Sequence, residues 1–406
     1  ASMTAFSAED YVYLDWAATA PLCEEAARAM APFLVPGRVN VALGANANSL
    51  HSPGRAAFAA LEDARRSLAR DLHAARASEI VLTSGATEAD NAAVLGLARA
   101  AVDARRQAGR AVAVPHVVTT AVEHEAVLEP VRVLERAGYR VTRLAPDARG
   151  FVQTGALADA VDGDTVLVSV QMANSEVGSI QPVADLAQIA HEAGALFHTD
   201  ATQALGKMPV DLAALGVDAA SFSAHKVGGP KGVGALYLRA RTPFSAQLLG
   251  GGQEDARRSG TQNVCGAAGF AAACHAACAS GEEESARQRA LRDRLYAELS
   301  RRPGVTATVD VRPGSDEFLP NIVHVLVEGL ESQTLVLRFD ALGFGVSGGS
   351  ACSSRDLGPS HVLQAMQAPP QAIDGSIRVS FCRESTEEMV HQLHIALQSA
   401  VKTLKG

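Results

Sequence analysis

The chain has 406 residues, of which 48% are hydrophobic and 20% charged, and its formal net charge is −8. This length and composition allow a large buried core and about two or three domains. Because basic residues are interspersed with acidic ones, and because no apolar run reaches the roughly 20 residues that span a bilayer, we expect neither nucleic acid nor a membrane as a partner.

The six cysteines are too few and too unevenly spaced for the disulfide framework of a secreted protein. The sequence also lacks the charged start and apolar stretch of a signal peptide, so reduced thiols and a cytoplasmic location are expected. Cys274 and Cys278 lie one helical turn apart beside His275, but a metal site needs further ligands. We interpret these cysteines as small buried helix residues and predict no metal site.

Short β-rich segments alternate with amphipathic helical segments from about residue 79 onward. The candidate strands are residues 79–83, 116–120, 165–170, 195–200, 219–223 and 234–238. This alternation is typical of a parallel sheet covered by helices, in which ligands bind beyond the carboxyl ends of the strands. We therefore expect the active site along that edge of the sheet.

The pattern changes after about residue 265. It predicts a long helix over 282–301, strands near 322–327 and 376–381, and a final helix opened by a capping box of Ser385 and Glu388. The C-terminal part is therefore interpreted as a smaller α+β domain.

Polar residues follow three of the candidate strands. Residues 83–88 read Thr-Ser-Gly-Ala-Thr-Glu between a strand and a helix, a junction whose N–H groups can hold a phosphate. His124 begins the helix after the next strand, where it can stack on a ring or move a proton, or simply be a partly buried polar residue. Asp200 ends an apolar strand, and its carboxylate can pair with a pyridinium nitrogen or cap the following helix.

Two later segments carry candidate nucleophiles. Lys226 follows the strand 219–223 and precedes the glycines of residues 228–232, a setting that suits a Schiff base because partial desolvation favours the neutral amine. Taken alone, a surface turn explains this segment equally well. Cys352 lies among the glycines and serines of residues 347–354. That composition is typical of an exposed loop with a reactive thiol, although an incidental loop thiol is equally consistent with it.

Taken together, these segments closely resemble the cysteine desulfurases, in the class V branch of the fold-type-I pyridoxal-phosphate enzymes. The resemblance covers nearly the whole chain and is carried by these motifs in order: Tyr13-Leu14-Asp15, Ala17-Ala18-Thr19, His51 with Gly54-Arg55, residues 84–88, Glu123-His124, residues 200–203, His225-Lys226, residues 258–261, residues 349–352 and Ser376-Ile377-Arg378. It implies an α/β fold with a mainly parallel seven-stranded sheet between helices. A large cofactor-binding domain would span residues 15–262. A small α+β domain, made of residues 1–14 and 263–406, would carry the catalytic cysteine loop.

The resemblance also implies pyridoxal 5'-phosphate as the cofactor, held on Lys226 as a Schiff base. Asp200 would pair with the pyridine nitrogen, Gln203 would bond the phenolic oxygen and His124 would stack on the ring. The phosphate would be held by Ala86, Thr87, Ser223 and His225, joined by Thr261 from the second subunit of a homodimer. Arg378 would clamp the carboxylate of the substrate, L-cysteine.

The reaction implied by the resemblance converts L-cysteine to L-alanine. Lys226 would move the α-proton, and the Cys352 thiolate would attack the substrate sulfur to form a persulfide. The sulfur would then pass to a protein acceptor, an iron–sulfur scaffold or a sulfur carrier.

The chain departs from the family pattern in two places. Ser175, in the segment Asn174-Ser175-Glu176-Val177-Gly178, replaces the second of two asparagines that usually contact the cofactor and substrate, so Asn174 or a water would have to compensate. Ala47 replaces the usual proline of an early loop, which loosens a segment near the site.

Two alternatives remain open at this point. Another class V enzyme, such as a selenocysteine lyase or an aminotransferase, would share the cofactor anchors, and Cys352 argues against the aminotransferase more strongly than against the lyase. An inactive partner or scaffold protein is suggested by the change at Ser175. It is disfavoured because a binding module has little reason to keep Lys226, Asp200 and Cys352 together.

Overall fold

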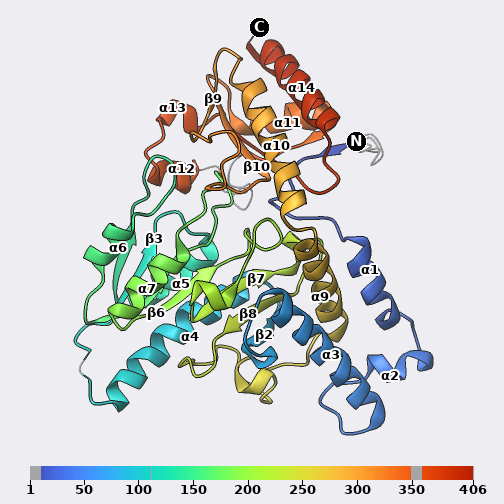
Figure 1. Ribbon diagram of the computed structural model, residues 1–406, viewed down its shortest axis with the longest axis vertical. Coiled ribbons are helices and arrows are strands. Elements are labelled where there is room, and N and C mark those ends of the chain that lie inside the picture. Colours follow the sequence, from blue (N-terminus) through green and yellow to red (C-terminus); the bar gives the residue numbers. More distant parts are fainter. Residues whose placement is uncertain (1–10, 111, 349–358, 406) are drawn as a thin grey trace.

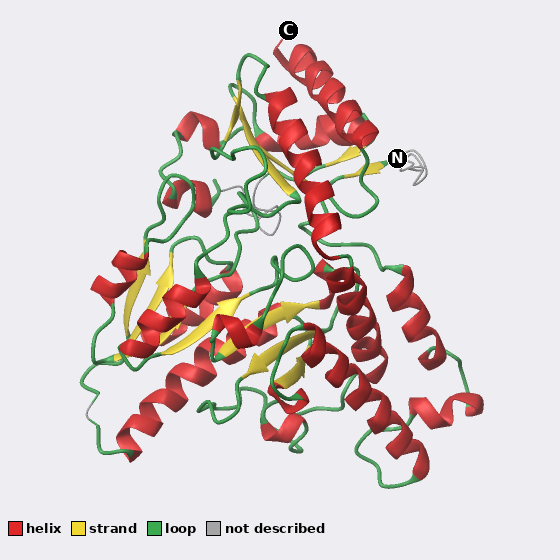
Figure 2. Ribbon diagram, viewed as in Figure 1, coloured by secondary structure: helices red, strands yellow, loops and turns green. Residues whose placement is uncertain are grey.

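The protein is described from a computed structural model that covers residues 11–110, 112–348 and 359–405. A seven-stranded sheet lies between helices, and a smaller part with a three-stranded sheet sits at one end of it (Figures 1 and 2). The predicted fold class, α/β with a mainly parallel sheet and a smaller α+β part, is confirmed.

The large sheet has the strand order β2-β8-β7-β6-β5-β3-β4. Its strands are β2 (Ile80–Thr83), β3 (His116–Thr120), β4 (Arg140–Leu144), β5 (Thr165–Ser169), β6 (Leu196–Asp200), β7 (Ala219–Ser223) and β8 (Gly234–Leu238). β8 runs antiparallel to β2 and β7, and the other neighbouring pairs are parallel. Six of these strands match the predicted segments, because each is a buried run that contains apolar, aromatic or β-branched residues. The edge strand β4 was not predicted, because its exposed arginines break the apolar pattern.

Helices cover both faces of this sheet. One face packs against α4 (Ala86–Gln107) and α5 (Glu125–Arg136). The other packs against α3 (Ser52–Asp71), α7 (Val183–Glu192) and α9 (Val264–Ala279). The remaining short elements of this part are α1 (Glu24–Met30), η1 (Ala31–Phe33), η2 (Arg38–Asn40), α2 (Val41–Gly44), η3 (Ala77–Glu79), α6 (Thr154–Ala160), α8 (Leu212–Leu215), η4 (Ala224–Lys226) and η5 (Glu254–Ala256).

The smaller part lies at the top of Figure 1. Its antiparallel sheet has the order β12 (Ser376–Ser380), β10 (Ile322–Val327), β9 (Val305–Ala307), and it packs with α10 (Gly281–Leu299), α11 (Ser332–Ala341) and α14 (Glu387–Lys405). The short helices α12 (His361–Ala365) and α13 (Pro370–Ile373) lie beside it. The N-terminal strand β1 (Val12–Tyr13) pairs with β11 (Phe344–Gly345), which attaches the start of the chain to this part.

The predicted domain boundary after residue 262 stays a prediction. α9, which follows that boundary, packs against α1 and α3, and its residues Phe270 and Cys274 belong to the core of the large sheet. The change of direction comes later, at Ser280, where α9 and α10 meet at an angle of 74°. The packing therefore favours a boundary near Ser280.

The N-terminal cap of α14 differs from the predicted capping box. The Thr386 hydroxyl accepts the N–H of Met389 at 3.2 Å, whereas the Ser385 hydroxyl accepts the N–H of Cys382 at 3.0 Å. Ser385 therefore stabilises the turn before the helix, and the predicted box of Ser385 and Glu388 is wrong by one residue.

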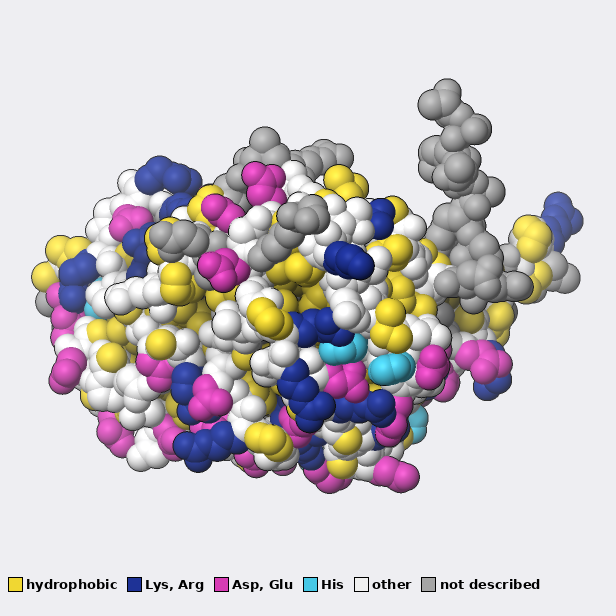
Figure 3. Space-filling view, turned by 90° about the horizontal axis from the view of Figure 1, so that it is seen from above, with side chains coloured by type: hydrophobic (Ala, Val, Ile, Leu, Met, Phe, Trp, Pro, Cys, Tyr) yellow, Lys and Arg dark blue, Asp and Glu magenta, His cyan; other side chains and the backbone are white. Residues whose placement is uncertain are grey.

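Within the described ranges no single helix is long and apolar enough to cross a membrane, and one bent pair, α9 with α10, reaches that length and hydropathy together. On the face shown in Figure 3, basic and acidic side chains are interspersed.

Candidate active site

A pocket of about 520 Å³ opens at the carboxyl ends of the parallel strands, a size typical of cofactor sites. Ten of the predicted site residues line it: Ala86, Thr87, His124, Ser175, Asp200, Gln203, Ser223, His225, Lys226 and Arg378. The fold therefore brings together side chains that are far apart in the sequence, from Ala86 to Arg378. We call this cavity the cofactor pocket.

Lys226 is positioned by the sharp turn after β7. The strand ends at Ser223, and the single turn η4 (Ala224–Lys226) carries the lysine over the sheet edge, where its Nζ donates to the carbonyls of Ala17 at 2.7 Å and Ala18 at 2.8 Å. Gly228 follows with φ +82°, and a Cβ at this position would lie 3.0 Å from that of Cys23. Glycine is required here for both reasons, so the glycines after Lys226 shape the turn that presents the amine.

Asp200 and Gln203 lie at the end of β6, opposite Lys226 in the same pocket. The Asp200 Oδ1 atom accepts the N–H of Thr202 at 2.9 Å, which fixes the buried carboxylate at the sheet edge. The Gln203 amide donates to Ala17 O at 3.0 Å, and its Oε1 atom is buried without a hydrogen-bond partner in the described chain. A buried acceptor of this kind indicates that the site is completed by a ligand. The amide nitrogen also has a second proton for a ring oxygen.

The phosphate end of the site is formed by the N-terminus of the 22-residue helix α4. Its first N–H groups have no acceptor within the helix and carry the positive end of the helix dipole. Glu88 in the first turn would repel an anion, but Arg258 neutralises it through a hydrogen bond of 2.7 Å. Ser223 lies beside this helix start. The arrangement fits a phosphate.

His225 lies close to three lysines, Lys226, Lys231 and Lys207. Burial and the charges of Lys226, Lys231 and Lys207 lower the pKa of His225 to about 4, so its imidazole is neutral near pH 7. The ring Nδ1 lies 3.0 Å from Thr19 Oγ1. The lysines therefore supply the positive charge of this region, and the histidine supplies a neutral hydrogen-bonding group.

His124 caps the start of α5 and lies next to a buried carboxyl group. Its Nδ1 atom accepts the N–H of Ala126 at 3.1 Å, which fixes the ring at the pocket wall. The adjacent Glu123 is fully buried, bonded to Thr120 Oγ1 at 2.6 Å and to Gln171 N at 2.9 Å. Burial raises the pKa of Glu123 to about 8, so this group is protonated near pH 7.

Arg378 reaches the pocket from β12 of the smaller part. Its Nη2 atom pairs with Asp15 Oδ1 at 2.8 Å and its Nη1 atom donates to the Ser175 carbonyl at 2.8 Å. The Nε atom is buried and makes no hydrogen bond to the part of the chain that the structure describes. These contacts fix the plane of the guanidinium, as a carboxylate clamp requires.

Two of the described site residues, Asn174 and Thr261, do not line the cofactor pocket. The Asn174 Oδ1 accepts the N–H groups of Glu176 at 2.8 Å and Val177 at 3.0 Å, so this amide stabilises the turn and does not face a substrate. Thr261 is exposed and does not line the pocket of its own chain. Cys352 lies outside the described residues.

Several residues of the site were not singled out from the sequence. Asp15 was noted in a motif, but its contact with Arg378 joins positions 363 residues apart and has no local signal. Asp90 lines the pocket, is fully buried, and has its Oδ1 3.6 Å from His198 Nε2. Burial raises the pKa of Asp90 well above its usual range. The sequence did contain a signal for the burial of Asp90, because its spacing places it on the same helix face as the apolar residues Val94 and Leu97.

The predicted absence of a metal site concerns the cysteines of α9. Among the residues that the structure describes, no three His, Cys, Asp or Glu side chains are grouped in a way that would hold a metal ion. The His275 ring instead lies 3.2 Å from Asp71 Oδ1.

Comparison with known proteins assigns the family. Residues 12–393 match the family described as Aminotransferase class-V. The chain is 39% identical over 394 residues to the cysteine desulfurase IscS of Dictyoglomus turgidum, which covers 97% of this chain and 95% of the relative. A solved NifS-like protein superposes with a TM-score of 0.85 at 34% identity, covering 97% of this chain and 99% of that one. A solved structure of SspA in complex with cysteine superposes with a TM-score of 0.75 at 30% identity, covering 91% and 98%. This chain therefore belongs to the pyridoxal-phosphate-dependent cysteine desulfurases of the class-V aminotransferase family.

Proposed function

We propose that this enzyme acts on L-cysteine as a homodimer, receives the sulfur on Cys352 and passes it to a protein acceptor for iron–sulfur cluster assembly or thio-modification. The observation that carries the proposal is the meeting of Lys226, Asp200 and Arg378 in one pocket. The structural similarity to SspA, which was solved in complex with cysteine, supports the choice of substrate.

Different residues of the pocket would bind different groups of the cofactor. Asp200 holds a negative charge where a protonated ring nitrogen would be stabilised, and the α4 N-terminus with Ser223 would hold the phosphate. When bound, pyridoxal phosphate supplies an electron sink for the pair released from the substrate Cα–H bond. Gln203 would fix the ring oxygen with its second amide proton.

The amine of Lys226 is the base that moves the α-proton. Its contacts with the carbonyls of Ala17 and Ala18 hold the side chain at the sheet edge. Arg378, fixed by Asp15, would orient the substrate carboxylate so that the α-proton faces this amine.

The transfer of sulfur from the substrate to Cys352 requires no added oxidant. The Cys352 thiolate attacks the substrate sulfur, the carbon–sulfur bond breaks, and the sulfur remains on Cys352 as a persulfide. The electron pair left on the β-carbon takes up one proton, the α-carbon regains the proton that Lys226 removed, and alanine leaves. The persulfide is cleared when an acceptor thiol attacks its outer sulfur, so a second protein or a reductant is needed for turnover.

The homodimer is supported by the position of Thr261. This residue was assigned to the phosphate site of a second subunit, and on its own chain it is exposed and away from the cofactor pocket. The cytoplasmic location stays a prediction.

The experiment that tests the proposed function measures sulfide and alanine from L-cysteine with a reductant, on purified yellow protein. We expect equal amounts of both products. Cys352→Ser should keep the visible absorption band and lose sulfide release, Lys226→Ala should lose the band, and Cys265→Ser, on α9, serves as the matched thiol control with full activity.

Three outcomes would contradict the proposal. Full sulfide production by the Cys352→Ser variant would remove the persulfide role. Turnover without alanine would indicate another pyridoxal-phosphate reaction. Turnover of L-selenocysteine with no turnover of L-cysteine would identify a selenium-specific lyase.

A further inference from the structure

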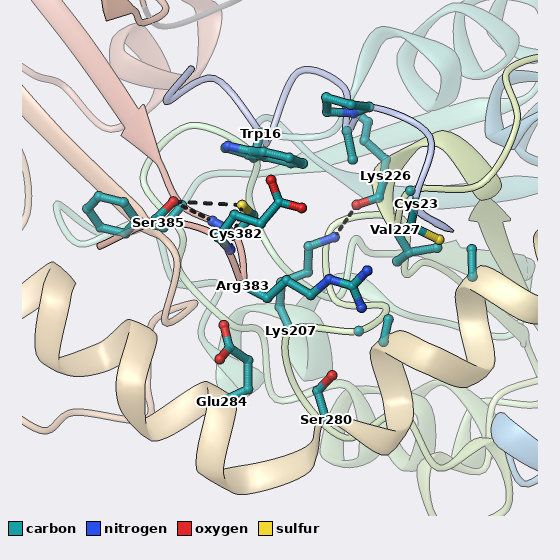
Figure 4. Close-up of a pocket in the computed structure, with 18 of the residues that line it drawn as sticks. Trp16, Cys23, Lys207, Lys226, Val227, Ser280, Glu284, Cys382, Arg383 and Ser385 are labelled. Carbon is teal, nitrogen blue, oxygen red and sulfur yellow. Dashed lines mark hydrogen bonds between the residues drawn. The ribbon is translucent and has the colours of Figure 1, made fainter. Parts of the chain in front are cut away.

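A second cavity adjoins the catalytic lysine and is not used by the reaction described above. It has a volume of about 460 Å³ and lies where the segment 16–23, the junction of α9 with α10, and the segment 381–385 meet (Figure 4). Lys226 lines both this cavity and the cofactor pocket. We call the second cavity the rear pocket.

The walls of the rear pocket are mainly apolar. They include the side chains of Trp16, Val227, Ala273, Ala276 and Phe381. A concave, largely apolar cavity of this size, with a few polar groups at fixed positions, is the usual form of a small-molecule site.

Two of the charged side chains at the rim, Glu284 and Arg383, are already paired, and a third, Glu384, is an exposed carboxylate that cannot anchor an anion. Glu284 accepts hydrogen bonds of 2.8 Å from Arg287 and 2.6 Å from Gln288. Arg383 pairs with Glu25 at 2.9 Å. Neither rim group is therefore available as the main anchor of a ligand.

Lys207 is the exception. Its Nζ atom donates to the Lys226 carbonyl at 2.6 Å, the contact drawn as a dashed line in Figure 4, and this is its one hydrogen bond to the described chain. An ammonium group has three protons, so two remain for the cavity. Burial and the charge of Lys226 lower the pKa of Lys207 to about 7, whereas Cys278 acts in the opposite direction. No carboxylate of the described residues contributes to this pKa.

Within the described part of the chain, no carboxylate forms an ion pair with Lys207, and a ligand can supply one. Inorganic phosphate would need several donors and would leave the apolar walls uncovered. A single carboxylate matches the two remaining protons of the ammonium group, and an apolar body matches the walls.

We propose that the rear pocket is a binding site for a small monocarboxylate, with its carboxylate on Lys207 and its apolar body between Trp16, Phe381 and Ala276. This site is separate from the substrate carboxylate site, because Arg378 lines the cofactor pocket and does not line the rear pocket.

The test uses 4-fluorobenzoate as the probe, titrated into the holoenzyme at about pH 6.5 and followed by fluorine NMR. We expect the carboxylate to bind at least about tenfold more tightly than the neutral 4-fluorobenzamide. Lys207→Met should weaken binding about tenfold, and Lys207→Arg should keep most of it. The matched control is Lys402→Met, which removes an exposed lysine of α14 that lines neither pocket and should leave probe binding unchanged.

The proposal is overturned if Lys207→Met binds the probe as well as the unmodified enzyme, if the amide binds equally well, or if no binding is seen at millimolar concentration. It is also overturned if crystals soaked in 4-iodobenzoate show iodine beside Arg378 and none beside Lys207. Should Lys207→Met fail to fold, Ala276→Phe fills the same cavity from α9 without touching the charge. Undiminished probe binding by that variant would contradict the proposal too.

Discussion

The guanidinium of Arg378 is held on two sides before any substrate arrives. Asp15 and the Ser175 carbonyl each lie 2.8 Å from one of its terminal nitrogens. A planar fork held in this way can bind a carboxylate with two parallel hydrogen bonds, which a lysine cannot reproduce. We therefore predict that Arg378→Lys raises the KM for L-cysteine about 10- to 100-fold while the visible band of the cofactor is retained.

Asp15→Asn is the matched variant for that measurement. It keeps a hydrogen-bond acceptor beside Arg378 and removes the charge, so its KM should rise less than that of Arg378→Lys. An unchanged KM in Arg378→Lys would show that the substrate carboxylate is bound elsewhere.

The buried Glu123 makes the free energy of unfolding of the protein depend on pH in a predictable direction. Burial raises its pKa from 4.5 to about 8 in the folded protein. The stabilising contribution of the protonated group is therefore fully present below about pH 4.5 and is lost as the pH rises to about 8, by at most about 1.4 kcal/mol per pH unit. Glu123→Gln imitates the protonated carboxyl group at every pH.

We predict that the unmodified protein loses more stability than Glu123→Gln between about pH 5.5 and about pH 8.5. Urea unfolding at both pH values measures the difference, and the other titrating groups cancel in the comparison. Parallel pH profiles of the two proteins would mean that Glu123 is ionised in the folded state.

At the scale of elements, a buried ion pair holds an unfavourable turn in place. In η5 (Glu254–Ala256) three consecutive residues have positive φ, 53° at Glu254, 55° at Asp255 and 61° at Ala256. Such angles are costly for residues other than glycine. Arg65 of α3 binds both carboxylate oxygens of Glu254 at 2.6 and 2.9 Å, and the same carboxylate accepts the N–H of Leu82 in β2 at 3.0 Å.

We expect Arg65→Met to lower the free energy of unfolding by about 3–5 kcal/mol, because it leaves the Glu254 carboxylate buried without its partner. Arg66→Met is the control on the next position of the same helix, where the arginine is exposed and pairs with exposed Asp63, and it should change stability little. Urea unfolding of the two variants measures the contrast, and equal effects would show that the pair is not what holds the turn.

The elements that the sequence predicted correctly are those with a local signal. Buried strands such as β2 and β8 are mainly apolar runs. Asp200 ends β6 and Lys226 follows the end of β7 by three residues, so the site could be placed at one sheet edge. β1 and β11 are two residues each, too short for any periodic pattern. The packing of α9 depends on its contacts with α1 and α3, which no local pattern of its Ala-rich sequence reveals.

At the scale of the whole molecule, the site is assembled from parts that are distant in the chain. The large sheet supplies Lys226 and Asp200, β12 of the smaller part supplies Arg378, and the N-terminal segment supplies Asp15. Long-range contacts of this kind could not be derived from the sequence pattern, and the family resemblance was needed to place Arg378 in the site. The contribution from a second subunit that we propose would extend the same principle beyond the single chain.

The proposed homodimer makes a specific prediction about mixed subunits. If Thr261 completes the phosphate site of the partner subunit, a dimer of one Lys226→Ala chain and one Thr261→Ala chain has one site with both defects and one site with none. We expect this mixed dimer, purified with two different affinity tags, to show about half of the wild-type sulfide production. The Lys226→Ala homodimer should be inactive, and the Thr261→Ala homodimer should bind the cofactor about tenfold more weakly. The assay is run at a cofactor concentration that leaves most sites of the Thr261→Ala homodimer empty. If Thr261 served its own chain, each site of the mixed dimer would carry one defect, and its activity would then fall well below half of the wild-type value.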